Sequence, residues 1–359
     1  MTKRIGVLTS GGDCPGLNAV LRGVVHAATA RDWETIGFLD GYEGLLSPVQ
    51  YRILDKRSTA GIMHLGGTIL GTTNKGRFVA KVGHGGKALL PQDIIAEAQE
   101  TLEGLGVEAL ITIGGDGSLS TSLQLQEAGI NTIGVPKTID NDIDATSMTF
   151  GFDSAVTCVV DALDRLHTTA KSHKRVMVLE VMGRYAGWIA LHGGLAGGAD
   201  IILIPEIPFN LENVFDVIRE REAKGAQNTM VVCAEGACLG DGDYVTKAKK
   251  AAGEARLGGI GEVVADAIAE NTGKDTRAVV LGHLQRGGNP TSLDRILGTR
   301  FGVHAVDLIA EKKYGHMVSY QNYLAGDVPM EEAVSQLKLV SRETQLVQTC
   351  REVGISFGD

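Results

Sequence analysis

The chain contains 359 residues, 43% of them hydrophobic, which is enough apolar material for two α/β domains with their own cores. Its 34 basic and 43 acidic residues give a formal net charge of −9, which argues against nucleic acid or an anionic membrane as the main partner. No apolar run approaches the roughly 20 residues of a membrane span, and residues 1–10 lead into a strand instead of a signal peptide, so we expect a cytoplasmic protein.

The first predicted element is an apolar strand at residues 4–8, followed by the loop TSGGDCPG at 9–16 and a helix at 17–30. Glycines therefore sit where a strand's carboxyl end meets a helix N-terminus. Bare backbone N–H groups at that positive end attract phosphate oxygens, and glycine lets the oxygens approach closely. The loop predicts a phosphate-binding site.

A second strand is predicted at residues 35–39, and a helix at 91–105. The segment between them contains GGTILGTTNKGR at 66–77, with glycines, hydroxyls and two cations. Lys75 and Arg77 either line a polyphosphate site or are solvated surface charges, and the pattern leaves both interpretations open.

The central unit begins with a strand at residues 109–113, which ends at GGDGS (114–118) before another helix. This is a second glycine loop of the same kind. Asp116 makes sense beside phosphates if it holds Mg²⁺, which is usually bound by one or two carboxylates plus the phosphates themselves. The alternative is a tight turn with an ordinary aspartate.

The next parallel strand, at residues 132–135, runs into PKTIDND at 136–142. Asp140, Asp142 and Asp144 fall within five positions, and they repel one another unless a cation or a proton separates them. A solvated acidic loop is the alternative. Because ligands of α/β sheets bind at the carboxyl edge of the strands, this loop and the glycine loops together predict phosphoryl transfer.

The second half of the chain continues the alternation of strands and helices. Strands are expected at 176–181, 201–204, 229–234 and 277–281. A long helix is expected to start within 149–155 and to run through 170, and further helices are expected at 188–197, 211–223, 260–271 and 294–312, with a polar helical tail from 331. The predicted fold class is α/β, with two similar Rossmann-like domains, largely parallel sheets and an interdomain active-site cleft. The expected domains are 1–150 plus 285–330 and 151–284 plus 331–359.

Four arginines lie at predicted strand ends in the second half: Arg175, Arg184, Arg277 and Arg286. One such arginine is usually a surface residue, but four beside glycine-containing loops favour an anion-binding wall. Cations on one wall and a metal site on the other predict a cleft for two phosphorylated molecules.

With these motifs in hand, the chain resembles the bacterial-type 6-phosphofructokinase family along nearly its whole length. The motifs that carry the resemblance are TSGGD at 9–13, GGDGS at 114–118, PKTIDND at 136–142, MGR at 182–184 and GHLQRGG at 282–288. The glycine motif GGDG alone would also suit NAD kinases or lipid kinases. The full set, in this order and spacing, is specific to the phosphofructokinases.

The resemblance implies that Asp140 is the general base for the 1-hydroxyl of fructose 6-phosphate, with Thr138 and Asp142 positioning the sugar. It implies that Arg184 stabilises the transferring phosphoryl group, and that Asp116 is the Mg²⁺ ligand. The resemblance further assigns Gly12, Gly115, Gly117 and Ser118 to the phosphates of ATP, and Met182, Gly183, Glu235, His283 and Arg286 to the sugar phosphate. Arg175 and Arg277 match residues that reach into a neighbouring subunit's site, which implies a homotetramer or homodimer with shared sites.

Two positions indicate different phosphoryl donors. Lys137 stands where the usual ATP enzymes have Gly and pyrophosphate-using relatives have Lys, whereas Gly117 is the ATP-type residue where those relatives carry Asp. An Asp at 117 would crowd and repel the α-phosphate, so Gly117 favours ATP. Pyrophosphate and ADP remain alternative donors. Asn74 replaces a phosphate-facing Arg of the ATP enzymes, and Lys75 or Arg77 is a candidate substitute.

The alternative from another functional class is a sugar-phosphate sensor that does not catalyse a reaction, but such a sensor would not need both Asp116 and Asp140.

We also expect altered allosteric control, because the effector pocket of the family is depleted of cations in this chain. Arg22 matches the family, His26 and Lys56 replace arginines, and Lys224 is followed by Ala226 where a second Lys is expected. His26, with an ordinary pKa of about 6.5, is expected to regain a positive charge as the pH falls.

Overall fold

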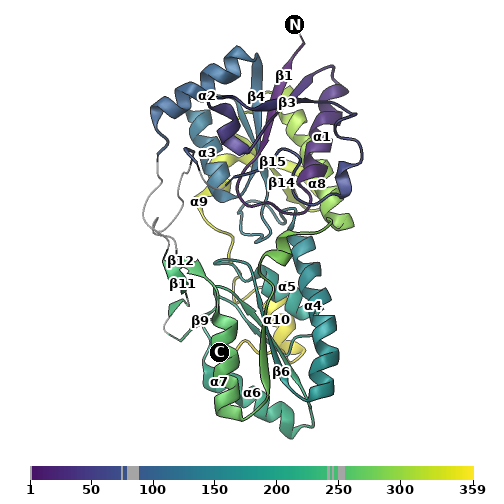
Figure 1. Ribbon diagram of the computed structural model, residues 1–359, viewed down its shortest axis with the longest axis vertical. Coiled ribbons are helices and arrows are strands. Elements are labelled where there is room, and N and C mark those ends of the chain that lie inside the picture. The colour runs from purple at the N-terminus through teal and green to yellow at the C-terminus, as the bar shows by residue number, and fades with distance from the viewer. Residues whose placement is uncertain (1, 74–75, 79–88, 241–242, 245, 250–254) are drawn as a thin grey trace. The chain divides into compact units, whose positions relative to one another are not determined.

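The computed structural model describes residues 2–73, 76–78, 89–240, 243–244, 246–249 and 255–359. The chain folds into two compact units, and Figure 1 labels many of their elements. The first unit comprises Met1–Ile139, Ile143–Ser154 and Arg286–Leu337, and the second comprises Asp140–Asp142, Ala155–Gln285 and Lys338–Asp359. None of the helices in the described ranges is long and apolar enough to cross a membrane.

The first unit is built on a seven-stranded sheet with the order β15-β14-β5-β4-β1-β2-β3. Its strands are β1 (Arg4–Thr9), β2 (Glu34–Phe38), β3 (Tyr51–Leu54), β4 (Val107–Gly114), β5 (Thr132–Pro136), β14 (His316–Gln321) and β15 (Leu324–Pro329). The five central strands are parallel, and the edge strands β3 and β15 pair antiparallel with their neighbours. Because β4 pairs with both β1 and β5, the loops that follow these three strands emerge at one edge of the sheet.

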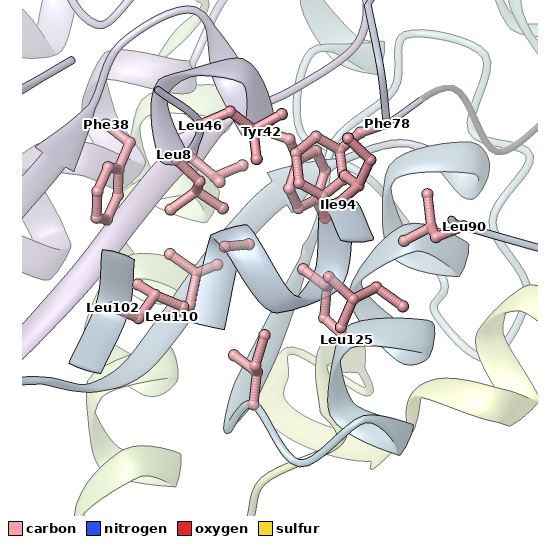
Figure 2. Close-up of a cluster of buried hydrophobic side chains, with 14 of the residues drawn as sticks. Leu8, Phe38, Tyr42, Leu46, Phe78, Leu90, Ile94, Leu102, Leu110 and Leu125 are labelled. Atoms are coloured by element: carbon pink, nitrogen blue, oxygen red, sulfur yellow. The ribbon is translucent and has the colours of Figure 1, made fainter. Parts of the chain in front are cut away.

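Helices cover this sheet and complete its core. They are α1 (Leu17–Thr29), α2 (Gln92–Gly104), α3 (Asp116–Glu127), α8 (Ser292–Ala310) and α9 (Met330–Ser335), with 3₁₀ turns η1 (Gly41–Leu45) and η2 (Ile62–His64). Figure 2 shows a cluster of buried hydrophobic side chains of this unit, which includes Tyr42 and Phe78. The ring centroids of Tyr42 and Phe78 lie 5.2 Å apart. Helices α1 and α8 pack so closely that a Cβ atom added at Gly23 of α1 would lie 2.6 Å from the carbonyl oxygen of Thr299 in α8.

The second unit has a four-stranded parallel sheet with the order β13-β6-β8-β7. Its strands are β6 (Val176–Val181), β7 (Ile201–Leu203), β8 (Thr229–Ala234) and β13 (Thr276–Val280), and two short antiparallel pairs join β9 (Cys238–Leu239) to β10 (Asp243–Tyr244) and β11 (Thr246–Lys249) to β12 (Ala255–Leu257). The helices are α4 (Phe152–His173), α5 (Trp188–Ala196), α6 (Leu211–Ala223), α7 (Ile260–Thr272) and α10 (Gln345–Glu352), with the 3₁₀ turn η3 (Gly282–Arg286). Strands β6 and β8 are buried along their whole length, as is typical of parallel sheets.

The predicted α/β class with largely parallel sheets is confirmed, but the division of the chain differs in detail from the expected domains. The first unit continues to Ser154 and includes α9, which we expected in the second domain. The reason is apolar packing, because Met330 and Ala333 of α9 are buried in one cluster with Leu119 of α3. The acidic residues 140–142, expected in the first domain, pack with the second unit instead.

Candidate active site

The first glycine loop lies at the carboxyl end of β1, as the sequence predicts. Gly11 has a φ of 82°, in the left-handed region that favours glycine. Its N–H donates to the carbonyl oxygen of Thr73 at 3.1 Å, and Thr72 Oγ1 donates to the Gly11 carbonyl at 2.7 Å. Residues 72–73, from the glycine-rich stretch expected near phosphate, therefore brace this loop.

The second glycine loop is shorter than predicted, because α3 begins at Asp116 and Gly115 is its N-cap. Gly117 and Ser118 thus belong to the first helical turn, where backbone N–H groups are unpaired by the helix itself. Ser118 Oγ donates to Ser10 Oγ at 3.0 Å, which joins the two glycine loops directly. The first turn of α3 therefore offers backbone donors to a phosphate group beside the first glycine loop.

Two cations lie on these loops. Lys137 is only 4% exposed, and its Nζ donates to the carbonyl oxygen of Gly12 at 2.5 Å. Arg286 donates from one guanidinium nitrogen to the Asp13 carbonyl at 3.3 Å, and a Cβ on Gly12 would overlap its guanidinium. Among the described residues, none provides a hydrogen-bond partner for the buried Nε of Arg286. The resemblance assigns Arg286 to the sugar phosphate, and the structure places its guanidinium against the first glycine loop.

Asp116 lies half-buried in the first turn of α3, beside these backbone donors. In the part of the chain that the structure describes, no group of three or more His, Cys, Asp or Glu side chains could hold a metal ion. Mg²⁺ does not need such a group, because it takes one or two protein carboxylates and completes its shell with water and substrate phosphates. A single carboxylate on a phosphate-binding surface fits Mg²⁺ that arrives with the donor.

The acidic loop is buried in the second unit. Asp140, Asn141 and Asp142 are 5%, 4% and 7% exposed. Lys338 contacts this loop twice, through its backbone N–H to the Asp142 carbonyl at 2.8 Å and through Nζ to Asn141 Oδ1 at 3.1 Å. Thr138, just before the loop, belongs to the first unit, where its carbonyl accepts from Thr149 Oγ1 at 2.8 Å. The carboxylates that the sequence assigned to catalysis are therefore held inside the protein.

Asp144, the third carboxylate of the predicted cluster, has a different environment. Its side chain accepts hydrogen bonds from Gln336 Nε2 at 2.6 Å and from the Ala145 N–H at 2.8 Å. These partners account for Asp144 as a local turn residue, which leaves Asp140 and Asp142 as the catalytic candidates.

A second cluster forms where β6 and β8 end. Glu235 follows β8, and its Oε1 accepts from the Arg184 N–H at 3.1 Å. Burial raises the pKa of Glu235, and the nearby negative charge of Asp140 raises it further, whereas backbone hydrogen bonds from residues 183 and 184 act against both. The structure thus brings Asp140, the backbone of Arg184 and Glu235 together.

The turn that carries Arg184 has an unusual backbone. Gly183 and Arg184 have φ values of 145° and 51°, and a Cβ on Gly183 would lie 2.5 Å from the Ala186 carbonyl oxygen. Gln285, 1% exposed, accepts from the Met182 N–H at 2.9 Å and so supports the same turn. Gln285 was not among the predicted site residues, because an uncharged residue within GHLQRGG has no chemical signal that selects it. His283 of the same motif is exposed.

The four arginines expected on one wall are separated in the structure. Arg175 and Arg277 lie at the amino ends of β6 and β13, away from the carboxyl ends that carry Arg184 and Glu235. Both pair with Asp275, at 2.7 and 2.6 Å. The prediction that these arginines line one wall is therefore wrong within a single chain, because Arg175 and Arg277 lie at the opposite end of the strands from Arg184.

Two further expectations concern surface cations. Asn74 and Lys75 lie outside the described residues. Arg77 is described, and its side chain approaches Glu43 at 3.6 Å and Glu97 at 3.5 Å, so carboxylates surround it. In the expected effector pocket, partial burial lowers the pKa of His26, and the positive charges of Arg22 and Lys56 lower it further.

Lys224, the remaining cation of the expected effector pocket, lies in the second unit at the end of α6. It is 77% exposed and pairs with Glu220 at 3.5 Å.

The paired glycine loops, the buried acidic loop and the parallel sheets are the arrangement of an α/β protein that binds phosphorylated ligands. Residues 4–309 match the family model described as Phosphofructokinase, so this chain belongs to the phosphofructokinase family, which confirms the resemblance. The ATP-dependent 6-phosphofructokinase of Chloroflexus aggregans is 51% identical over 357 residues, which cover 99% of this chain and 98% of that protein. The pyrophosphate–fructose 6-phosphate 1-phosphotransferase of Amycolatopsis methanolica is 48% identical, over 95% and 97% of the two chains.

A solved structure has the same fold. Phosphofructokinase from Pichia pastoris in the T-state aligns with a TM-score of 0.82 and 30% identity over 99% of this chain. The chain spans 37% of the length of that larger protein.

Proposed function

We propose that this protein is an ATP-dependent 6-phosphofructokinase. It is a phosphotransferase that moves a phosphoryl group from ATP to the 1-hydroxyl of fructose 6-phosphate, forming fructose 1,6-bisphosphate in glycolysis. Relatives of nearly the same length and about half-identical sequence carry this name. We extend the proposal to action in the cytoplasm, where both substrates are available.

The observation that carries the choice of donor is the contact between Lys137 and Gly12. Lys137 is the one marker that pointed to pyrophosphate, but its ammonium bonds to a carbonyl of the glycine loop and so has a role in the loop itself. The second marker, Gly117, leaves the first turn of α3 without a side chain. A nucleotide α-phosphate can approach there without meeting a carboxylate.

Pyrophosphate is the second candidate donor, and one observation favours it. A relative that is 48% identical over 95% of this chain is named for pyrophosphate. ADP stays an alternative on the same loops, with no observation that prefers it.

In the proposed reaction, Asp140 accepts the proton of the 1-hydroxyl as this oxygen attacks the γ-phosphorus, while Thr138 and Asp142 orient the sugar. Arg184 adds positive charge against the transferring group. Gly12, Gly115, Gly117 and Ser118 bind the donor phosphates through backbone and hydroxyl donors. Mg²⁺, when bound, neutralises charge on the donor phosphates, and Asp116 would hold it.

The raised pKa of Glu235 suits a carboxyl group that hydrogen-bonds sugar hydroxyls. The remaining sugar-phosphate ligands in the proposal are Met182, Gly183, His283 and Arg286. Arg175 and Arg277 act in the site of a neighbouring subunit within a homotetramer or a homodimer. The separation of this pair from Arg184 supports that assignment.

The reaction is tested by ³¹P NMR of the purified protein with ATP, Mg²⁺ and fructose 6-phosphate. We expect ADP and a second phosphomonoester resonance, that of the 1-phosphate, to grow in equal amounts. Release of inorganic phosphate without a new sugar-phosphate resonance, or no turnover at all, would contradict the proposal and favour the sensor alternative.

A further inference from the structure

One residue of the C-terminal segment, Lys338, joins two functional elements of the second unit. Its N–H donates to the Asp142 carbonyl, and its Nζ donates to Asn141 Oδ1. Its own carbonyl accepts from the indole Nε1 of Trp188 at 2.7 Å. Trp188 is the first residue of α5, which follows the turn carrying Arg184. Lys338 therefore contacts the acidic loop and the start of α5 at once.

The acidic loop has a conformation that needs such support. Asn141 has a φ of 53°, in the left-handed region that costs energy for residues other than glycine, although asparagine tolerates it best. Its neighbours in sequence are Asp140 and Asp142, so the backbone at Asn141 sets the directions of both carboxylates. A buried amide also requires hydrogen-bond partners. The Lys338 ammonium supplies one, and a hydrogen bond from a charged donor is stronger than one between neutral groups.

The backbone of the segment is anchored independently of the Lys338 side chain. The Val340 N–H donates to Glu206 Oε1 at 2.9 Å, and Arg342 Nε donates to the Glu206 carbonyl at 3.0 Å. The Glu206 carboxylate also accepts from the N–H of Gly187, the N-cap of α5, at 2.9 Å. Removal of the Lys338 side chain should therefore leave the path of the segment unchanged.

We propose that Lys338 is a positioning residue for phosphoryl transfer: its ammonium fixes Asn141, and so holds the flanking carboxylates of Asp140 and Asp142 toward the acceptor hydroxyl. Lys338 itself does not contact the substrate. The inference rests on the proposed function, in which Asp140 is the base. A displacement of about 1 Å in a catalytic group is enough to cost roughly 10²-fold in rate.

The direct test is steady-state kinetics of Lys338→Met and Lys338→Arg. We expect Lys338→Met to lower kcat about 10–100-fold, with the KM for ATP changed by less than about threefold, because the donor loops belong to the other unit. Lys338→Arg keeps a charged donor and should recover most of kcat. Lys313→Met removes a different lysine, one that pairs with Glu311 and Asp327, and should match the wild type.

Trp188 provides a check that the segment remains docked. Lys338 Nζ lies 5.8 Å from the centre of its indole ring, so the emission of Trp188 reports on this contact. In a Trp33→Phe background, Trp188 is the sole tryptophan of the chain. We expect Lys338→Met to alter its emission maximum slightly while the melting temperature stays near that of the parent, and a large red shift with a lower melting temperature would instead assign Lys338 a structural role.

A double-mutant cycle with Asn141→Gly tests the route of the effect. Glycine keeps the positive φ and removes the side chain that Lys338 contacts. If Lys338 acts through Asn141, adding Lys338→Met to Asn141→Gly should lower kcat by less than about twofold further. Two results would overturn this inference and leave the proposed function intact. One is a double mutant whose loss of kcat equals the product of the two single losses, and the other is a Lys338→Met enzyme whose kcat is within about twofold of wild type. An inactive wild-type protein would overturn the proposed function, and this inference with it.

Discussion

The ammonium nitrogen of Lys137 lies 2.5 Å from the carbonyl oxygen of Gly12. This contact joins the end of β5 to the first glycine loop. The Lys137 N–H also donates to the Gly114 carbonyl at 2.9 Å. One residue thus connects both loops, and its buried charge is directed to the place where donor phosphates are expected. Lys137 is therefore part of the loop architecture as well as a source of charge.

The first prediction follows from this contact. Lys137→Met keeps the length of the side chain but removes a charge-assisted hydrogen bond worth about 1.5–3 kcal/mol, so kcat/KM for ATP should fall roughly 10–100-fold. The KM for fructose 6-phosphate should change little. Initial-rate kinetics with each substrate varied will measure both, and an unchanged kcat/KM for ATP would mean that the ammonium stabilises neither the loop nor the donor.

The second prediction concerns the base. Asp140→Asn should lower kcat by about 10²–10⁴, the usual range for losing a positioned general base, with both KM values within a few-fold. Asp144→Asn is the matched control, because Asp144 belongs to the same acidic cluster but has Gln336 and Ala145 as its partners. Similar rates for Asp140→Asn and wild type would remove Asp140 from the mechanism.

Much of this site could be predicted from sequence, because glycine loops and carboxylates have local signals. The strands before them are short apolar runs, and the helices after them have clear periodicity, so the loops were placed at the correct sheet edge. The β14–β15 hairpin was not predicted. Its turn residues Asn322 and Tyr323 have φ values of 50° and 64° without any glycine, so the usual turn signal is missing.

Other features depend on contacts between distant parts of the chain. Lys338 contacts Asn141, and Arg286 contacts the loop of Gly12, but neither pair has a local pattern that connects its members. The prediction of an arginine wall was wrong for a related reason. The sequence indicated that the residues lie at strand ends, but Arg175 and Arg277 precede or begin their strands, whereas Arg184 follows one.

The third prediction tests the shared site. Arg175→Ala and Asp140→Asn subunits should each be inactive alone. If Arg175 acts in a neighbouring subunit, random mixing by reversible dissociation gives intact sites in about a quarter of cases, and activity should return to that extent. Arg219→Ala, which breaks a surface pair with Asp216, serves as the control partner. Hybrids verified by native mass spectrometry that stay inactive would place Arg175 in its own subunit's site.

The fourth prediction concerns pH and allosteric control. Burial and the charges of Arg22 and Lys56 lower the pKa of His26, so His26 carries less positive charge at a given pH than an ordinary histidine. The expected recovery of charge is therefore moved to lower pH. Phosphoenolpyruvate or ADP should change half-saturation by fructose 6-phosphate less than about twofold at both pH 6.5 and pH 8.

His26→Arg restores a permanent charge and should strengthen this response at both pH values. The measurement is fructose 6-phosphate saturation with and without each effector. A strong response of the wild type that is independent of pH would show that other residues form the effector pocket.

The most direct measurement for the whole account is the comparison of kcat/KM for ATP, ADP and pyrophosphate at saturating fructose 6-phosphate, in wild type and in Gly117→Asp. We predict that wild type prefers ATP by more than about 100-fold and that Gly117→Asp loses most of its ATP activity, because a carboxylate in the first turn of α3 repels the α-phosphate. Gly117→Asn adds the same bulk without charge and should lose less. A wild-type preference for pyrophosphate, or ATP kinetics unaffected by Gly117→Asp, would contradict the account.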